Sequence, residues 1–341
     1  MDLIAATTAA FERLPLPDSL TRAGIATLVG RTSRRLDRVD PAFERRFAEE
    51  MADYPIALSP DAANAQHYEL PPAFFAHVLG PRRKYSCCLY ESPGASLAEA
   101  EEAALDATAR HADLADGQEI LELGCGWGSL SLWMAERFPG ARITAMSNSH
   151  GQRGHIEAEA VRRGLGNLRV VTADMNLFDP GRRFDRIVSV EMWEHMSNWQ
   201  ALLDRVRDWI ADDGRLFLHV FSHRSVPYRF ETSDRSDWIA QHFFTGGVMP
   251  SHGMIRHLDG SFAVERDWRW DGTHYQRTAE HWLANYDAHG AAIDTILAEV
   301  YGADAPLWRR RWRLFFLATS GLFGARGGGD WGVSHYRLAP S

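Results

Sequence analysis

The sequence has almost no lysine and little cysteine. Of its 37 basic residues only Lys84 is a lysine, and its three cysteines are Cys87, Cys88 and Cys125. Two of the cysteines are adjacent and the third lies in a glycine-rich segment, so neither a disulfide framework nor a metal-ligand spacing is present. We therefore expect no metal site and a reducing compartment, the cytoplasm.

Long hydrophobic runs and a positive net charge are also missing. No window approaches the roughly twenty apolar residues of a membrane span, and residues 1–20 lack the basic start and apolar core of a signal peptide. The net charge of −8 argues against nucleic acid as a partner, because phosphate binding needs a basic surface. With 45% hydrophobic and 24% charged residues, the composition is that of a soluble globular protein.

The first 80 residues predict helices with short breaks. Apolar residues recur at three- and four-residue spacing over 20–36 and 42–52, and Pro41 suits the first turn of the second helix. We expect residues 1–80 to form an N-terminal helical cap on a main domain that comprises residues 81–341.

From residue 118 onwards the sequence alternates between strands and helices. Seven strands are predicted, at 118–123, 141–146, 168–172, 184–191, 215–221, 262–270 and 331–338. Helices are predicted at 130–138, 152–163, 198–210, 278–300 and 305–323. Such alternation implies right-handed βαβ units and a largely parallel sheet. It is interrupted by an insert at about 222–270 that is rich in aromatic residues, histidine and glycine.

Two carboxylates and an imidazole stand at the end of the fourth predicted strand and just after it, in Glu191, Glu194 and His195. The carboxyl ends of parallel strands border the crevice in which open α/β sheets bind their ligands. Side chains of these types move protons near neutral pH when burial and neighbours adjust their pKa values. A lone histidine after a strand is more often structural, but beside Glu194 we favour a catalytic role. Glu191 fits a catalytic or a supporting role equally well.

A glycine-rich loop, residues 124–128, follows the first strand and opens a helix. Glycines there let the backbone turn tightly and approach a ligand closely. The spacing is GxGxG rather than the GxGxxG of dinucleotide sites, and no acidic residue ends the second strand to hold an NAD ribose. A dehydrogenase is therefore the less favoured alternative. With Glu122 before it and Asp174 after the third strand, the loop resembles motif I of class I S-adenosylmethionine-dependent methyltransferases.

Further motifs are similar to the cyclopropane fatty acid synthase superfamily, most of all to its plant coclaurine and pavine N-methyltransferases. They are residues 85–90, the glycine loop, Asn148 with Gln152, and residues 191–196, 242–251, 274–275 and 331–336. Together they span some three-quarters of the chain. The resemblance implies an α/β, Rossmann-like class I methyltransferase fold. It would have a mostly parallel seven-stranded sheet, the N-terminal helical cap, and the insert covering the substrate pocket.

The resemblance also implies S-adenosylmethionine as the cofactor. The residues that would bind it are Tyr85, Ser86, Gly124, Gly126, Gly128, Ser147, Asn148, Gln152, Asp174, Met175 and Asn176. The residues that would contact the substrate are Trp193, His242, Phe243 and Trp331. Trp193 stands where this family commonly has phenylalanine, a change that would reshape the pocket.

For the N-methyltransferases, the resemblance implies that Glu194 and His195 handle the substrate amine, with Glu191 assisting. An alkylamine with a pKa of about 10 is mostly protonated at pH 7, so it has no lone pair with which to attack a methyl group. A carboxylate can bind the ammonium and a neighbouring base can remove its proton. We therefore favour N-methylation of a small-molecule amine.

The lipid-cyclopropanating branch remains an alternative, because its pocket holds a bicarbonate ion as the base. The contacts of that ion match Cys87, Glu194, His219 and Tyr275, and all four residue types are present. Transfer of a methylene group to an unsaturated lipid is therefore the second hypothesis. The negative net charge, the absence of an evident membrane-binding helix, and Thr245 in place of the usual proline before the paired glycines argue against it.

A third hypothesis is a protein that binds S-adenosylmethionine without turnover. The intact glycine loop and the Glu194–His195 pair argue against it. The sequence leaves the identity of the substrate, the number of methyl transfers and the oligomeric state open, with a homodimer as one option.

Overall fold

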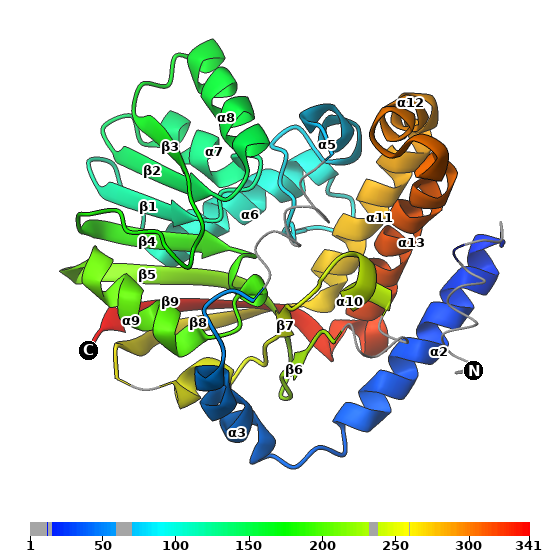
Figure 1. Cartoon of the computed structure of the whole chain (residues 1–341), viewed down its shortest axis with the longest axis horizontal. Helices are drawn as coiled ribbons and strands as arrows, with labels where there is room; N and C mark the ends of the chain where they lie inside the picture. Colours follow the sequence, from blue (N-terminus) through cyan, green and yellow to red (C-terminus); the bar gives the residue numbers. More distant parts are fainter. Residues whose placement is uncertain (1–11, 13–15, 59–69, 232–237, 259) are drawn as a thin grey trace.

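The computed structural model describes residues 12, 16–58, 70–231, 238–258 and 260–341. Its centre is a seven-stranded sheet in the order β3-β2-β1-β4-β5-β9-β8 (Figure 1). The strands are β1 Glu119–Leu123, β2 Arg142–Ser147, β3 Leu168–Thr172, β4 Phe184–Val190, β5 Ile210–His223, β8 Phe262–Asp271 and β9 Trp331–Pro340. Strands β1 to β5 pair in parallel, whereas β9 runs antiparallel to both β5 and β8. This confirms the predicted fold class.

Helices cover both faces of the sheet. They are α6 Leu97–Ala112, α7 Ser129–Arg137 and α8 His150–Arg163 on one face and α9 Trp199–Trp209 on the other. Neighbouring residues of β1 illustrate why: Ile120 packs in the cluster of α6 and α7, and Leu121 packs in the cluster of α9. Successive side chains of a strand point to opposite faces, so two apolar residues in a row fill both layers.

The order of the strands places the functional crevice. Strand order reverses between β1, which continues to β2, and β4, which continues to β5. In open α/β sheets, ligands bind outside the carboxyl ends of the strands at such a switch point. The glycine loop after β1 and Glu191 after β4 therefore meet at the same edge, as the sequence predicts.

Three helices stand together beside the sheet, on the right of Figure 1: α11 Gly272–Ala288, α12 Gly290–Tyr301 and α13 Ala305–Phe323. The prediction of one helix over 278–300 was wrong. The helix breaks at His289, whose backbone (φ −99°, ψ 25°) is not helical. It also begins earlier, at Gly272, because the Asp271 side chain accepts the backbone N–H of Thr273 and caps the helix.

The described part of the predicted cap contacts two different regions. Its elements are α2 Asp18–Leu36, α3 Phe43–Glu50, the 3₁₀ turn η1 Met51–Asp53, and α5 Pro72–Val78. Helix α2 runs along α13, with ion pairs from Arg313 to Asp18 and from Arg22 of α2 to Glu280 of α11. Helix α3 lies against the insert at the bottom of Figure 1. The division into cap and main domain stays a prediction.

Between β5 and β8, the described part of the insert contains only short elements. They are β6 Tyr228–Arg229, α10 Trp238–His242, β7 Val248–Met249 and η3 Met254–His257. Three further 3₁₀ turns occur at η2 Trp193–His195, η4 Gly302–Asp304 and η5 Ala325–Gly328. The parts of the predicted cap and insert at 1–11, 13–15, 59–69, 232–237 and 259 lie outside the described residues.

Candidate active site

The glycine loop presents open backbone to a cavity at the strand ends. Gly124, Gly126 and Gly128 all have positive φ, at 79°, 52° and 81°, a region that other residues seldom adopt. A Cβ atom on Gly124 would lie 2.6 Å from the Cβ of Met192, and one on Gly128 would lie 2.7 Å from Ile156. A Cβ on Gly126 would meet nothing within 4 Å. Two glycines thus permit tight packing, and the third leaves room for a ligand.

The structure brings most of the predicted cofactor residues to this one cavity. The predicted residues that line it are Gly124, Gly126, Ser147, Asn148, Gln152, Asp174, Met175, Glu191 and His195. Four others, Tyr85, Ser86, Gly128 and Asn176, do not line it. Asn176 contacts the cavity only indirectly. Its Oδ1 accepts the N–H of Ala57 at 3.0 Å and so holds that cap residue at the cavity wall.

Sequence reasoning missed six residues of the cavity wall. They are Ala57, Met146, Ala173, Met192, Met196 and Thr245. Ala57 comes from the cap and Thr245 from the insert, so the wall is built from three parts of the chain. Small and apolar residues carry no chemical signal in a sequence, and only the fold identifies them as lining residues.

The wall of the cavity carries a buried, unpaired hydrogen-bond donor at Gln152. This side chain is 1% exposed, and its Oε1 accepts the Ser147 hydroxyl at 2.6 Å. Its Nε2 is buried without a hydrogen-bond partner. A buried donor left unpaired costs about 1–3 kcal/mol, and a ligand with an acceptor atom at this point would remove that cost. The predicted cofactor therefore fits the donors that are present.

Glu191 is the first residue on the side of the crevice that holds the predicted catalytic residues, which we call the catalytic side. It has φ 49°, a backbone conformation that is strained for a residue with a side chain, and its N–H is bonded to the carbonyl of His219 at 2.8 Å. This conformation turns the carboxylate toward two donors and a histidine nitrogen. Oε1 accepts the N–H of Cys87 at 2.9 Å and lies 3.1 Å from Nε2 of His219, and Oε2 accepts the Tyr275 hydroxyl at 2.7 Å. Strained residues of this kind concentrate at functional sites.

Lys84, the only lysine of the chain, holds in place the backbone that donates to Glu191. The Lys84 side chain is buried, and its Nζ donates to the Cys87 carbonyl at 2.8 Å and to the Ser86 hydroxyl. Lys84 therefore fixes the backbone of Cys87, the residue whose own N–H points at Glu191. Ser86 thus anchors Lys84, while the ring of Tyr85 packs between Phe75 and Trp282.

Glu194 lies beside Glu191 and is completely buried. Its Oε1 accepts the backbone N–H of Phe221 at 2.7 Å, and its Oε2 has no hydrogen-bond partner. Burial raises the pKa of Glu194 well above its usual range, and the neighbouring Glu191 raises this pKa further. Burial also raises the pKa of Glu191, but the Lys84 charge and the bonds from Cys87 and Tyr275 oppose the rise. Two neighbouring buried carboxylates share a single negative charge more readily than they hold two. We place that charge on Glu191, because hydrogen-bond donors surround it, and the proton on Glu194.

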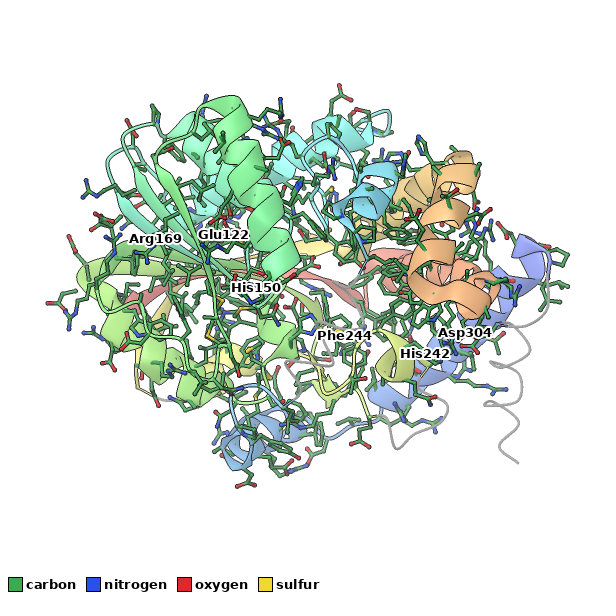
Figure 2. The ribbon with its side chains drawn as sticks, turned by 45° about the horizontal axis from the view of Figure 1, so that its top comes forward. Glu122, His150, Arg169, His242, Phe244 and Asp304 are labelled. Atoms are coloured by element: carbon green, nitrogen blue, oxygen red, sulfur yellow. The ribbon has the colours of Figure 1, made fainter. Side chains whose placement is uncertain are left out.

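His195 faces the same cavity, with its ring stacked on Phe244 of the insert at 4.4 Å between centroids. Figure 2 shows Phe244 nearer to the sheet than His242, which lies toward the helices beside it. The insert thus supplies one face of the pocket in which the imidazole lies. A carboxylate and an imidazole at one cavity, beside an open glycine loop, can bind a cation and remove its proton.

The four predicted substrate residues lie away from the cavity wall. Trp193, Phe243 and Trp331 are each 0% exposed. Trp193 packs against Trp199, and the ring of Phe243 stacks on Phe315. The fourth residue is His242, whose Nε2 lies 3.1 Å from Oε1 of Glu12. In this structure these side chains pack the walls and the insert.

Known proteins resemble this chain over most of its length. The model of the mycolic acid cyclopropane synthetase family matches residues 58–326. The chain belongs to this family. Within it, the chain is 34% identical over 285 residues to (S)-coclaurine N-methyltransferase of Thalictrum flavum subsp. glaucum, covering 82% of the chain and 79% of that relative. Cyclopropane mycolic acid synthase 1 of Mycobacterium tuberculosis is 30% identical over 262 residues, covering 72% of the chain and 90% of that relative.

Among solved structures, a coclaurine N-methyltransferase bound to N-methylheliamine and S-adenosylhomocysteine superposes with a TM-score of 0.92. The two proteins are 32% identical, and the match covers 98% of this chain and 99% of the other. The predicted family, the methyltransferase class and S-adenosylmethionine as cofactor are thereby confirmed. No described helix is long and apolar enough to cross a membrane, and no described cluster of acidic, histidine or cysteine side chains could hold a metal ion. The homodimer and the cytoplasmic location stay predictions.

Proposed function

We propose that this protein transfers a methyl group from S-adenosylmethionine to the nitrogen of a small-molecule amine. The observation that carries the proposal is the Glu191 carboxylate, which three donors hold at the wall of the cofactor cavity. A fixed anion at that point attracts a cation and places it beside His195. The relatives named coclaurine N-methyltransferase support the same class of substrate.

Side chains of the protein would bind the substrate and remove its proton. The substrate enters as an ammonium ion, and Glu191 binds it while His195 takes one proton, which frees the lone pair on nitrogen. When bound, S-adenosylmethionine supplies the methyl group, whose bond to sulfur breaks as the new bond to nitrogen forms. The product nitrogen then carries the positive charge, and the proton on His195 passes to solvent. Holding the two reactants together in a closed crevice adds to the rate.

We also propose that Glu191 takes the place that a bicarbonate ion would have in the lipid-modifying branch. Of the four matching positions, Cys87, His219 and Tyr275 all direct a donor at the Glu191 carboxylate. A second anion among the same donors would meet the charge of Glu191 at close range, which is unfavourable in a buried site. The base would therefore belong to the protein, and bicarbonate would have no place in the reaction.

A methyl-transfer screen tests the function. The purified protein with S-adenosylmethionine would be offered arylalkylamines in one set and vesicles of unsaturated phospholipid in another, with products read by mass. We expect amines to gain one or more methyl groups with their basicity retained, and lipids to remain unchanged. A lipid product that gains one methylene and loses its double bond would select the second hypothesis. Binding of the cofactor without any product in either set would indicate a protein without turnover.

A further inference from the structure

Behind Glu191, three imidazoles are hydrogen-bonded in series. Nε2 of His219 lies 3.1 Å from Oε1 of Glu191, and its Nδ1 lies 2.8 Å from Nε2 of His335. The other nitrogen of His335, Nδ1, lies 2.8 Å from Nδ1 of His111. The series therefore uses both ring nitrogens of the two inner histidines and leads away from the catalytic carboxylate.

The topology of the sheet creates this series. His219 of β5 and His335 of β9 are directly opposite partners in the antiparallel register, and both are 0% exposed. His111 stands in the last turn of α6 and is partly exposed. Its ring stacks on Trp268 of β8, with 3.9 Å between centroids and 7° between the planes. Four elements that are distant in sequence thus fix the three rings.

The series has a direction, because a neutral imidazole has one N–H donor and one bare acceptor nitrogen. Burial lowers the pKa of His219 and of His335 well below the usual range, and burial together with nearby arginines lowers the pKa of His111 to about 4. All three rings are therefore neutral near pH 7. If His111 donates from Nδ1, then Nδ1 of His335 accepts and Nε2 of His335 carries the proton, which it donates to Nδ1 of His219. His219 then carries its own proton on Nε2 and donates it to Glu191.

We propose that His111 and His335 are positioning residues that keep His219 in the tautomer donating to the Glu191 carboxylate. The proposal deepens the proposed amine methylation and rests on it for its kinetic consequence. Without the donor at position 111, His335 can hold its proton on Nδ1, and His219 can then turn a bare nitrogen toward the carboxylate. Glu191 would lose a hydrogen bond to its charged form, so its pKa would rise.

Other charged or titratable groups surround the series and must be held constant in any test. They are Lys84, Cys87, Glu194 and Tyr275 at the inner end and Arg110, Arg266 and Arg337 at the outer end. None of them is altered by a substitution at position 111.

The test compares His111→Asn with His111→Leu. The Nδ2 of asparagine takes nearly the place of histidine Nδ1 and keeps a donor, whereas leucine has none. The exposed His289, outside the series, provides the control His289→Leu. The first measurement is the ¹⁵N NMR spectrum of histidine-labelled protein with S-adenosylhomocysteine, which distinguishes protonated from bare ring nitrogens. The second is the pH dependence of kcat/KM for amine methylation.

We expect His219 and His335 to be protonated on Nε2 in the wild type, in His111→Asn and in His289→Leu, and at least one of them to change tautomer in His111→Leu. The acid limb of kcat/KM should move up by about one pH unit in His111→Leu alone, the shift that corresponds to one lost hydrogen bond to a charge. Unchanged tautomers, or equal effects of Asn and Leu, would overturn the proposal. If no amine is methylated, the proposed function fails, while the spectra still decide whether the series is polarised.

Discussion

The two sides of the crevice work by different physical means. The cofactor side is formed by glycine backbone and by neutral side chains such as Gln152, and its essential property is the space beside Gly126. The catalytic side is formed by buried ionisable groups, and its essential property is the set of donors on Glu191. The first side should therefore be sensitive to added volume and the second to a change of charge. Substitutions that alter only one of these properties can separate the two.

The largest effect is expected on the catalytic side, from Glu191→Gln. The amide keeps the shape of the side chain but cannot attract an ammonium ion, so kcat/KM for the amine should fall by about a thousandfold. The dissociation constant for S-adenosylmethionine, measured by calorimetry, should stay within about twofold, because the donors of the cofactor side are unchanged. Glu194→Gln should lower kcat/KM less than Glu191→Gln does, because Glu194 is the protonated, neutral member of the pair and glutamine is also neutral. Equal losses of cofactor binding and turnover would contradict the division into two sides.

The next largest effect concerns the stability of the fold and comes from Glu122, a buried carboxyl two residues before the glycine loop. Burial raises the pKa of Glu122 to about 7 from 4.5, although the Ser131 hydroxyl, which donates to it, opposes the rise. Between pH 4.5 and 7 the folded protein keeps this proton and the unfolded chain releases it, so stability falls as pH rises, by up to about 3 kcal/mol.

Glu122→Gln removes this dependence, because the amide is neutral at every pH. In urea unfolding, the variant should gain stability relative to the wild type as the pH rises from 5 to 8. The gain should appear within that window and should level off above it. A difference that stays constant with pH would show that Glu122 titrates normally in the folded state.

The smallest effect is expected from a substitution that fills the open space beside Gly126 on the cofactor side. Gly126→Ala puts a methyl group into the open side of the loop, and we expect the cofactor dissociation constant to rise about tenfold, the equivalent of roughly 1.4 kcal/mol. Gly117→Ala is the matched control, because Gly117 also has positive φ and free space but lies in an exposed turn. Both variants carry a similar backbone strain of about 1–2 kcal/mol. Equal cofactor affinities in the two variants would refute the role given to Gly126.

The difference between the two sides also explains how much the sequence could predict. The cofactor side follows from local signals, because Gly124, Ser147 and Asp174 each stand at or just after the end of a strand, and parallel strands end at one edge. The sheet, its seven strands and the meeting of the glycine loop with Glu191 were predicted on this basis. The helix Leu97–Ala112 was missed, although Ser96 and Glu99 form a capping box at its start.

The catalytic side depends on contacts that no local pattern encodes. Cys87, Glu191, His219 and Tyr275 come from four separate segments, and only the resemblance to a family grouped three of them around an anion. That the Glu191 carboxylate lies among these groups could not be predicted, because its position depends on the strained backbone of this residue. The imidazole series could not be predicted either, because it depends on the register that places His335 opposite His219.

The central claim is that the protein's own carboxylate, Glu191, provides the anion of the active site. The most direct test is the initial rate of amine methylation in buffer purged of carbon dioxide, compared with the rate at saturating bicarbonate. We predict equal rates for the wild type, and no rescue of Glu191→Gln by bicarbonate. A wild-type rate that depends on bicarbonate would contradict the account and would return the role of base to a bound ion.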